Sequence, residues 1–290
     1  LPGMIITPMA PILYGTSSWS EKSWLGPFYP PGTKPAEFLR VYAEQFRTVE
    51  ADVTYYRVPD ARMVDGWKDK TPDDFVLSAK FPRSIVHGGE GKTPDPAKVL
   101  ILDAVRGDLD QFLSSMARLG SKCGPLVLQF PYFNRRVFPG AGPFLERLDR
   151  FLDELPDGFR YGVEVRNKYW VQQPLLELLR RHGVALVLVD LPYMTHPDRL
   201  AQKLDLVTAD FTYVRLIGDR KAVEKEADGF DRIVIDQGPR LARWAELLAK
   251  LLDEIPDAWI YANNHYAGHG PATILELADL VLDRDQSSST

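Results

Sequence analysis

The chain has 290 residues, of which 45% are hydrophobic and 26% charged, and this composition excludes a disordered or fibrous protein. A net charge of −5 excludes nucleic-acid binding through an overall positive charge, although a local basic site stays open. Cys123 is the single cysteine, which excludes an internal disulfide framework and a thiolate zinc cluster.

Eight short apolar runs with the composition of β-strands recur along the chain, and longer amphipathic stretches follow most of them. The predicted strands are Ile12–Gly15, Thr48–Asp52, Phe75–Lys80, Pro125–Phe130, Tyr161–Arg166, Val184–Asp190, Tyr213–Leu216 and Trp259–Asn263. The predicted helices are Ala36–Phe46, Ala61–Lys70, Val99–Leu119, Pro143–Leu155, Pro174–His182, Pro239–Ile255 and Ala272–Leu282. No clear long helix is predicted between 191 and 210.

The predicted loops differ in length according to the end of the strand that they join. Joints from helix to strand are short and carry a Pro-Asp pair that ends the helix, as at Pro72, Pro156 and Pro256. Joints from strand to helix are long, so the long loops gather at the C-terminal ends of the strands, where α/β proteins build active sites. The pattern predicts one (β/α)8 TIM-barrel domain over residues 4–285.

Both ends of the chain are expected to lie outside the barrel. Leu1–Gly3 precede Met4 and resemble a remnant added before the native start, and residues 286–290 form a polar tail. No stretch approaches the roughly 20 apolar residues that cross a membrane, and the first residues lack the basic segment of a signal peptide. We therefore expect a cytoplasmic protein with no membrane partner.

Polar side chains stand at or near the C-terminal ends of most predicted strands. They are Glu50, Asp52, Lys80, Gln129, Glu164, Arg166, Asp190, Arg215, Asn263 and Asn264. A parallel strand covered on both faces should read as continuous apolar residues, and an unpaired charge there costs several kcal/mol. Period-two alternation predicts that Glu164, Arg166 and Arg215 point toward the barrel axis.

Two interpretations of these charges are open. They either form buried ion pairs that set strand register, or they build a functional site. All of them lie toward one end of the strands, under the long loops, which favours the site. Asp52 and Gln129 are weaker members that orient their neighbours in this interpretation.

An ordered series of motifs runs along nearly the whole chain. The motifs are Tyr14-Gly15-Thr16-Ser17-Ser18-Trp19, Gly26-Pro27-Phe28-Tyr29-Pro30, Val49-Glu50-Ala51-Asp52-Val53-Thr54-Tyr55-Tyr56-Arg57-Val58-Pro59, Ala79-Lys80-Phe81-Pro82-Arg83 with Ile85 and His87, Gln129-Phe130-Pro131, Glu164-Val165-Arg166 with Trp170, Tyr213-Val214-Arg215-Leu216, and Asn263-Asn264-His265-Tyr266-Ala267-Gly268. In this order they resemble the YecE-like family, catalogued as domain of unknown function 72. The resemblance implies a TIM barrel and no established reaction.

The chain departs from this family pattern at two positions. The family often has histidine where this chain has Asn167 and Ile217. A role that depends on those histidines therefore does not carry over to this chain.

The strand-end residues suggest acid-base chemistry at the barrel mouth. Glu164 and Asp190 are candidates for the general acid and base, and Glu50 is a third. Lys80 is a candidate for a Schiff base, but electrostatic contact with an anion is favoured because acidic residues surround it. Arg166 and Arg215 suit a carboxylate or phosphate of the substrate.

Further polar and aromatic residues are candidates for substrate binding. They are Gln129, Asn263, Asn264 and His265 for hydrogen bonds, and Trp19, Tyr55, Tyr56 and Trp170 for stacking, with core packing as the other interpretation of each ring. The favoured function is an enzyme for a small anionic or polyhydroxylated substrate, and both hydrolase and lyase chemistry fit.

No cofactor is predicted. The five histidines are scattered without the spacing of metal ligands, and His265 and His269 are interpreted first as loop contacts. The metal option that remains is a single Mg²⁺ ion on Glu164 and Asp190.

Two other functions stay open. In one, Arg57, Arg83, Arg135 and Arg136 on the long loops bind the phosphates of a nucleic acid, which the protein holds or processes, while tyrosines stack on its bases. In the other, the barrel is a non-catalytic scaffold that binds a ligand and releases it unaltered.

Overall fold

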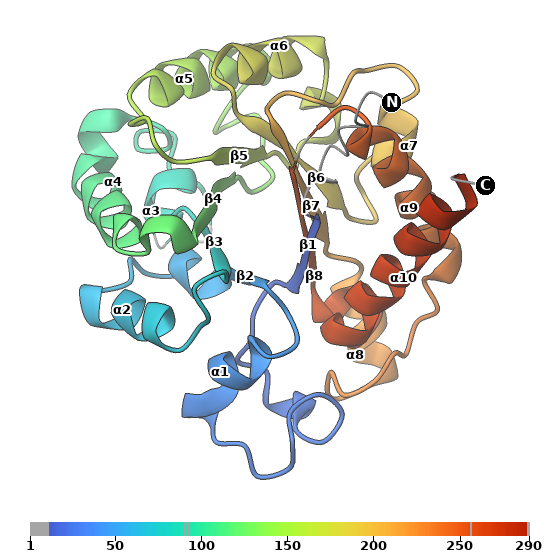
Figure 1. Cartoon of the computed structure of the whole chain (residues 1–290). Coiled ribbons are helices and arrows are strands. Elements are labelled where there is room, and N and C mark those ends of the chain that lie inside the picture. Colours follow the sequence, from blue (N-terminus) through green and yellow to red (C-terminus); the bar gives the residue numbers. More distant parts are fainter. Residues whose placement is uncertain (1–11, 90, 92, 256, 289–290) are drawn as a thin grey trace, which may run out of the picture.

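A computed structural model describes residues 12–89, 91, 93–255 and 257–288, in which eight parallel strands form one sheet that curls into a nearly closed barrel (Figure 1). The strands are β1 (Ile12–Thr16), β2 (Thr48–Ala51), β3 (Val76–Lys80), β4 (Cys123–Gln129), β5 (Tyr161–Glu164), β6 (Ala185–Asp190), β7 (Phe211–Leu216) and β8 (Asp257–Ala262). Their order in the sheet is β1-β8-β7-β6-β5-β4-β3-β2. The predicted TIM barrel is confirmed, with each predicted strand at its expected place.

Helices follow the strands and surround the sheet (Figure 1). They are α1 (Phe38–Tyr42), α2 (Ala61–Asp69), α3 (Arg83–Val86), α4 (Leu102–Ala117), α5 (Ala141–Asp153), α6 (Gln173–Arg181), α7 (Pro197–Leu200), α8 (Arg220–Glu226), α9 (Gly238–Leu252) and α10 (Gly270–Ser288). The 3-10 turns are η1 (Lys22–Trp24), η2 (Pro35–Glu37), η3 (Asp52–Tyr55), η4 (Gly120–Lys122), η5 (Lys168–Trp170) and η6 (Asn264–Tyr266). The segment after β6, for which no long helix was predicted, forms the four-residue α7.

The two ends of the chain differ in what the structure describes. Leu1–Gly3 lie outside the described residues. At the other end α10 continues through Ser288, into the stretch that was expected as a polar tail. None of the described helices is both long and apolar enough to cross a bilayer.

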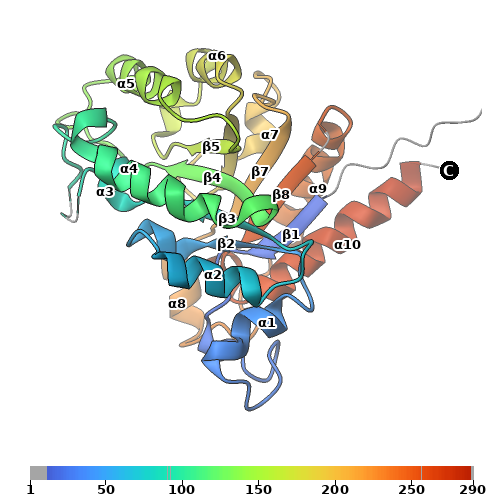
Figure 2. The same cartoon turned by 60° about the vertical axis from the view of Figure 1, so that its left-hand side comes forward.

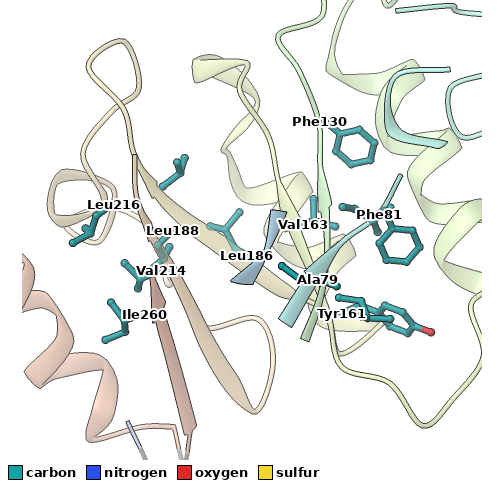
Figure 3. Packing of buried hydrophobic residues seen from close by; sticks show 14 of the residues in the cluster. Ala79, Phe81, Phe130, Tyr161, Val163, Leu186, Leu188, Val214, Leu216 and Ile260 are labelled. Atoms are coloured by element: carbon teal, nitrogen blue, oxygen red, sulfur yellow. The ribbon is translucent and has the colours of Figure 1, made fainter. Parts of the chain in front are cut away.

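The alternation of side chains along each strand separates an outer core from the barrel interior. Outward residues such as Val163, Val214 and Ile260 belong to the large apolar cluster, part of which is shown in Figure 3. In the turned view α2 and α4 lie across the strands β2 to β4 (Figure 2). The interior cluster includes Val187 from β6 and Tyr213 from β7. The strand ends therefore present one set of side chains to the helices and another to the barrel axis.

The seam between β1 and β2 is closed by a tyrosine side chain. These strands stand at the two edges of the sheet order, and no ladder joins them among the described residues. The Tyr42 hydroxyl accepts a hydrogen bond from the Thr16 backbone N–H (2.8 Å) and donates one to the Thr48 carbonyl (3.1 Å). A Cβ atom on Gly15 would lie 2.3 Å from the same carbonyl, so glycine is required where the two backbones approach.

Replacing Tyr42 by Phe tests this closure. The change leaves a buried N–H on β1 and a buried carbonyl on β2 without their partner, so we expect a loss of about 1–3 kcal/mol in the free energy of unfolding, measured in urea. Tyr56→Phe is the control because this ring is 69% exposed, and its effect should stay within about 0.5 kcal/mol. Equal stability of the two variants would contradict the role of Tyr42.

Candidate functional site

A fully buried arginine, Arg215 of β7, lies where the C-terminal ends of the strands meet. Its Nη1 donates to a carboxylate oxygen of Glu164 and to Oε1 of Gln129, the latter at 2.8 Å. Its Nη2 donates to Oε1 of Glu50 at 2.9 Å. One guanidinium group therefore links β2, β4, β5 and β7 across the barrel.

Further charges extend this arrangement on both sides. Arg166 Nε donates to Oε1 of Glu164 at 2.8 Å, and Lys80 Nζ lies 3.4 Å from Oε1 of Glu50. Tyr213 adds a hydrogen bond of 2.8 Å from its hydroxyl to Glu50 Oε2. We call the alternating series of five charges the ionic chain. Its members are Arg166, Glu164, Arg215, Glu50 and Lys80.

The environment of the ionic chain keeps its two carboxylates ionised. Burial alone raises the pKa of Glu50, but the charges of Arg215 and Lys80 and the Tyr213 hydrogen bond outweigh it and lower the pKa to about 2. Burial likewise raises the pKa of Glu164, and its two arginine partners reverse the shift and lower the pKa. These carboxylates fit the ion-pair interpretation better than the general acid-base role expected from the sequence.

The structure does not bring Asp190 to Glu164, in contrast to the predicted acid-base pair. Glu164 points into the barrel, whereas Asp190 shares the outer face of β6 with Leu186 and Leu188. Its carboxylate accepts hydrogen bonds from Arg240 Nε (2.9 Å), Trp244 Nε1 (2.8 Å) and Tyr266 Oη (2.9 Å). Asp190 therefore fastens α9 and η6 to the sheet.

The same placement bears on metal binding. A Mg²⁺ ion shared by Glu164 and Asp190 does not fit, because the two carboxylates lie on opposite faces of the sheet and each is bonded to arginine. Among the described residues, no three His, Cys, Asp or Glu side chains gather in the manner of a metal site.

Burial shifts the pKa values of two titratable groups at the mouth in the direction that favours their uncharged forms. Asp52 begins η3 directly after β2 and is half-buried, and burial raises the pKa of its carboxyl while the Lys80 charge opposes the shift. Burial lowers the pKa of Lys80 against the opposing charge of Glu50. Each shift favours the neutral form of the group, which is the direction found at many acid-base residues. From the sequence, Asp52 is expected only to orient its neighbours.

A hollow of about 240 Å³, which we call the mouth hollow, opens beside Asp52 over the ends of β1, β2 and β8. It is lined by Thr16, Ser17, Ser18, Ser20, Glu21, Trp24, Asp52, Phe230, Ala262, Asn263, Asn264 and His265. The Ser17 hydroxyl is buried and has no hydrogen-bond partner in the described part of the chain. Neither Lys nor Arg is found among the described residues of this lining.

The predicted binding residues of the last strand do line the mouth hollow. Asn263 Oδ1 accepts hydrogen bonds from the backbone N–H and Nδ1 of His265, at 3.0 and 2.8 Å. Asn264 Oδ1 accepts from Trp24 Nε1 (3.2 Å) and from the Gly270 N–H (2.9 Å). Burial and the Arg220 charge lower the pKa of His265 and so favour its neutral form, while the Glu224 charge opposes this shift. The amide oxygens thus hold the loop in shape.

The predicted stacking residues are separated by the structure. Trp19 packs edge-on against Trp67, with 5.7 Å between the ring centroids. It lines neither the mouth hollow nor a second hollow, which lies over the loops after β4 and β5. The core-packing interpretation therefore applies to Trp19. Tyr55 is half-buried beside the charges of Arg83 and Arg166, and the exposed Tyr56 packs against it.

Other lining residues lie away from the mouth hollow or were missed. Trp170 lines the separate hollow over the loops after β4 and β5. Sequence reasoning missed Ser17 and Glu21 in the mouth hollow, and Tyr193 in the hollow beside Trp170. The paths of long loops place these three side chains, and no periodic signal marks them.

Comparisons with family models, protein sequences and solved structures agree on one family. The family model described as "Protein of unknown function DUF72" matches residues 13–289. UPF0759 protein YecE of Escherichia coli K12 is 31% identical over 185 residues, which span 62% of this chain and only 59% of that relative. UPF0759 protein YunF of Bacillus subtilis is 23% identical over 93% of this chain and 95% of its own length. The crystal structure of a DUF72 family protein from Thermotoga maritima matches with a TM-score of 0.66 and 25% identity, covering 93% of this chain and 98% of that one.

Replacing Arg215 by Met tests the ionic chain. The variant leaves Glu50 and Glu164 buried without their shared cation, and we expect a loss of about 3–5 kcal/mol in the free energy of unfolding at pH 7. In the native protein the lowered pKa of Glu50 adds stability that is present above the pKa of an unfolded glutamate and is lost as the pH falls toward 2.

In the variant the sign of this dependence reverses. Without Arg215, Glu50 keeps only Lys80 and Glu164 keeps only Arg166 against the effect of burial, so the pKa of both carboxyls rises. The penalty is therefore largest near neutral pH and shrinks when the carboxyls take up protons. Urea unfolding at pH 7 and pH 5 should show a smaller difference from the native protein at pH 5. Arg232→Met, at an exposed ion pair with Asp231, is the control and should change little. A penalty independent of pH would contradict this account.

Proposed function

The chain belongs to the DUF72 family, whose description assigns no reaction. We propose that this protein is an enzyme that binds a small polyhydroxylated substrate in the mouth hollow and transfers a proton through Asp52. The observation that carries the proposal is the chemistry of the lining. Hydroxyl, amide and carboxylate groups dominate it, and the half-buried ring of Phe230 adds apolar surface, whereas Trp24 is buried. Alternating donors and acceptors beside an aromatic face suit the hydroxyls and C–H face of a sugar or polyol.

Size and charge narrow the class of substrate. The volume of about 240 Å³ lies below the range of drug-sized ligand sites, which begins near 300 Å³, so a single sugar ring or a smaller polyol fits. A lining without Lys or Arg in the described part offers an anion no counter-charge. Of the two classes expected from the sequence, the polyhydroxylated one is therefore favoured for this hollow.

Asp52 is the proposed acid-base residue. It lines the mouth hollow, and burial brings the pKa of its carboxyl closer to neutral pH, where a general acid or base works best. The Lys80 charge opposes this shift and so keeps the ionised form within reach. Lys80 acts electrostatically, with Glu50 at 3.4 Å supporting its positive charge. Proton transfer by one carboxyl serves either hydrolysis or a lyase reaction.

The ionic chain supplies a rigid support for this chemistry. Arg215 holds Glu50 from β7, and Glu50 in turn lies beside Lys80 on β3. Because these groups are fixed before any substrate binds, the field at Asp52 needs little rearrangement during a reaction. Glu50 and Glu164 are thus positioning residues in this proposal.

Binding and turnover are tested on the purified protein with a panel of aldoses, ketoses, polyols and sugar acids. A ligand at about 100 times its Kd adds roughly 2.7 kcal/mol of stability, which a thermal-shift measurement detects. We expect neutral polyols or sugars to stabilise the protein, and NMR to show their conversion. In Asp52→Asn binding should persist while turnover falls at least about 100-fold.

Asp69→Asn is the matched control, because this exposed carboxylate at the end of α2 lies outside the mouth hollow. The pH profile of turnover should show an acidic limb above the ordinary pKa of aspartate, which Asp69→Asn leaves in place. A ligand that binds tightly but emerges unaltered would instead support the non-catalytic scaffold. No stabilisation by any polyhydroxylated compound would refute the proposal.

A further inference from the structure

Two further hollows lie over the loops that follow β4, β5 and β6, away from the mouth hollow. The first has a volume of about 520 Å³ and extends from Tyr132 to Tyr193. The second has about 470 Å³ and reaches Lys203 after α7. They share Lys168 and Tyr169, so we treat them as one feature, the loop groove.

The loop groove carries unbalanced positive charge. Its cations are Arg135, Arg166, Lys168, Arg199 and Lys203, and no Asp or Glu is found among the described residues that line it. Arg166 is paired with Glu164, but the other four have no carboxylate within ion-pair distance in the described part of the chain. Other exposed arginines differ from one another, because Arg40 and Arg118 are paired with acids, whereas Arg57 and Arg62 have no ion pair among the described residues. In a chain of net charge −5, this concentration of unpaired cations favours an anionic ligand.

Exposed aromatic rings accompany the cations. Tyr132, Tyr169 and Tyr193 are 63%, 80% and 52% exposed, and each comes from a different loop. The Lys168 ammonium lies 5.8 Å from the centre of the Tyr169 ring. Exposed rings beside cations are the arrangement that stacks on planar bases next to phosphates.

The floor of the groove is held rigidly. Asn167 accepts a hydrogen bond from the Phe133 N–H and donates one to the Phe133 carbonyl, both at 2.8 Å, which ties the β4 loop to the β5 loop. Trp170 packs on Phe133 and Phe144, with centroid distances of 6.1 and 5.0 Å. Because the loops are ordered in advance, a ligand loses less free energy in ordering them.

We infer that the loop groove binds single-stranded nucleic acid, with phosphates against the unpaired cations and bases against the three tyrosine rings. Each hollow has room for a nucleotide-sized ligand, and the joined groove therefore suits an oligonucleotide better than one nucleotide. A duplex would hide its bases from the rings. The inference goes beyond the proposed function, because no residue of the loop groove lines the mouth hollow.

Only part of the basic set expected from the sequence takes part. Arg135 lines the groove, whereas Arg57, Arg83 and Arg136 do not. Arg83 donates to the Gly91 carbonyl instead.

The inference is tested by fluorescence anisotropy with a labelled 12-residue oligo-dT or oligo-U at 50 and 200 mM salt. About three to five phosphate contacts on a single strand predict that Kd weakens roughly 20- to 100-fold between these salt concentrations. Binding of either oligonucleotide supports the inference, and a preference for oligo-U assigns a contact to the 2′-hydroxyl.

Two variants separate stacking from charge. Tyr169→Ala should weaken binding roughly 5- to 100-fold and leave the salt dependence unchanged. Lys203→Ala should reduce the slope of log K against log salt by about 0.7. The matched controls are Leu275→Ala and Lys250→Ala, exposed residues outside the groove, and the affinities of these variants should stay within about twofold of the native value. Circular dichroism confirms that each variant is folded.

Three outcomes would overturn the inference. The first is no binding at 50 mM salt, and the second is equal binding of a duplex of the same length. The third is displacement of the oligonucleotide by inorganic polyphosphate at equal phosphate concentration, because such displacement would indicate a basic surface that does not use its rings. Asp52→Asn should leave oligonucleotide affinity unchanged, so this result is independent of the test for a polyhydroxylated substrate.

Discussion

A buried guanidinium group is the constraint on which the upper end of this barrel depends. Arg215 is enclosed by strands, and its charge is tolerable there only because Glu50 and Glu164 meet it from β2 and β5. Removing Arg215 would leave Glu50 with only Lys80 and Glu164 with only Arg166, so the guanidinium group holds the strand ends in one register. The Tyr42 hydroxyl closes the remaining seam between β1 and β2. Together these contacts make the mouth of the barrel a rigid platform for the loops above it.

The ionic chain also separates two regions of unlike electrostatic character. The mouth hollow at one side contains Asp52, Asn263 and no described cation, and the loop groove at the other contains cations and no described acid. Arg166 belongs both to the chain and to the groove lining. The two proposals accordingly assign a neutral ligand rich in hydroxyls and a polyanion with planar bases to different places on the same face.

In the proposed function, the two interpretations of the strand-end charges apply to different residues. Glu50 and Glu164 are bonded to Arg215, and Asp190 is bonded to α9 and η6, as expected of structural ion pairs. Asp52 follows β2 directly in the sequence, is half-buried and lines the mouth hollow. The residues that stabilise the mouth thus differ from the residue best placed to react, which is consistent with rigid support around a less constrained reactive group.

The sequence by itself determined the strands, the longer helices and the inward direction of Glu164 and Arg215, because hydrophobic periodicity and the two-residue repeat of a strand are local properties. The short helices α3, α7 and α8 were not predicted, because few residues carry their pattern. Only the tertiary structure decided that Asp190 faces outward, since its partners Arg240 and Trp244 lie about 50 residues later in the chain. It also decided which loop residues line the two sites. Ser17 and Tyr193 are placed by the paths of long loops, which depend on packing between distant segments and leave no periodic trace in the sequence.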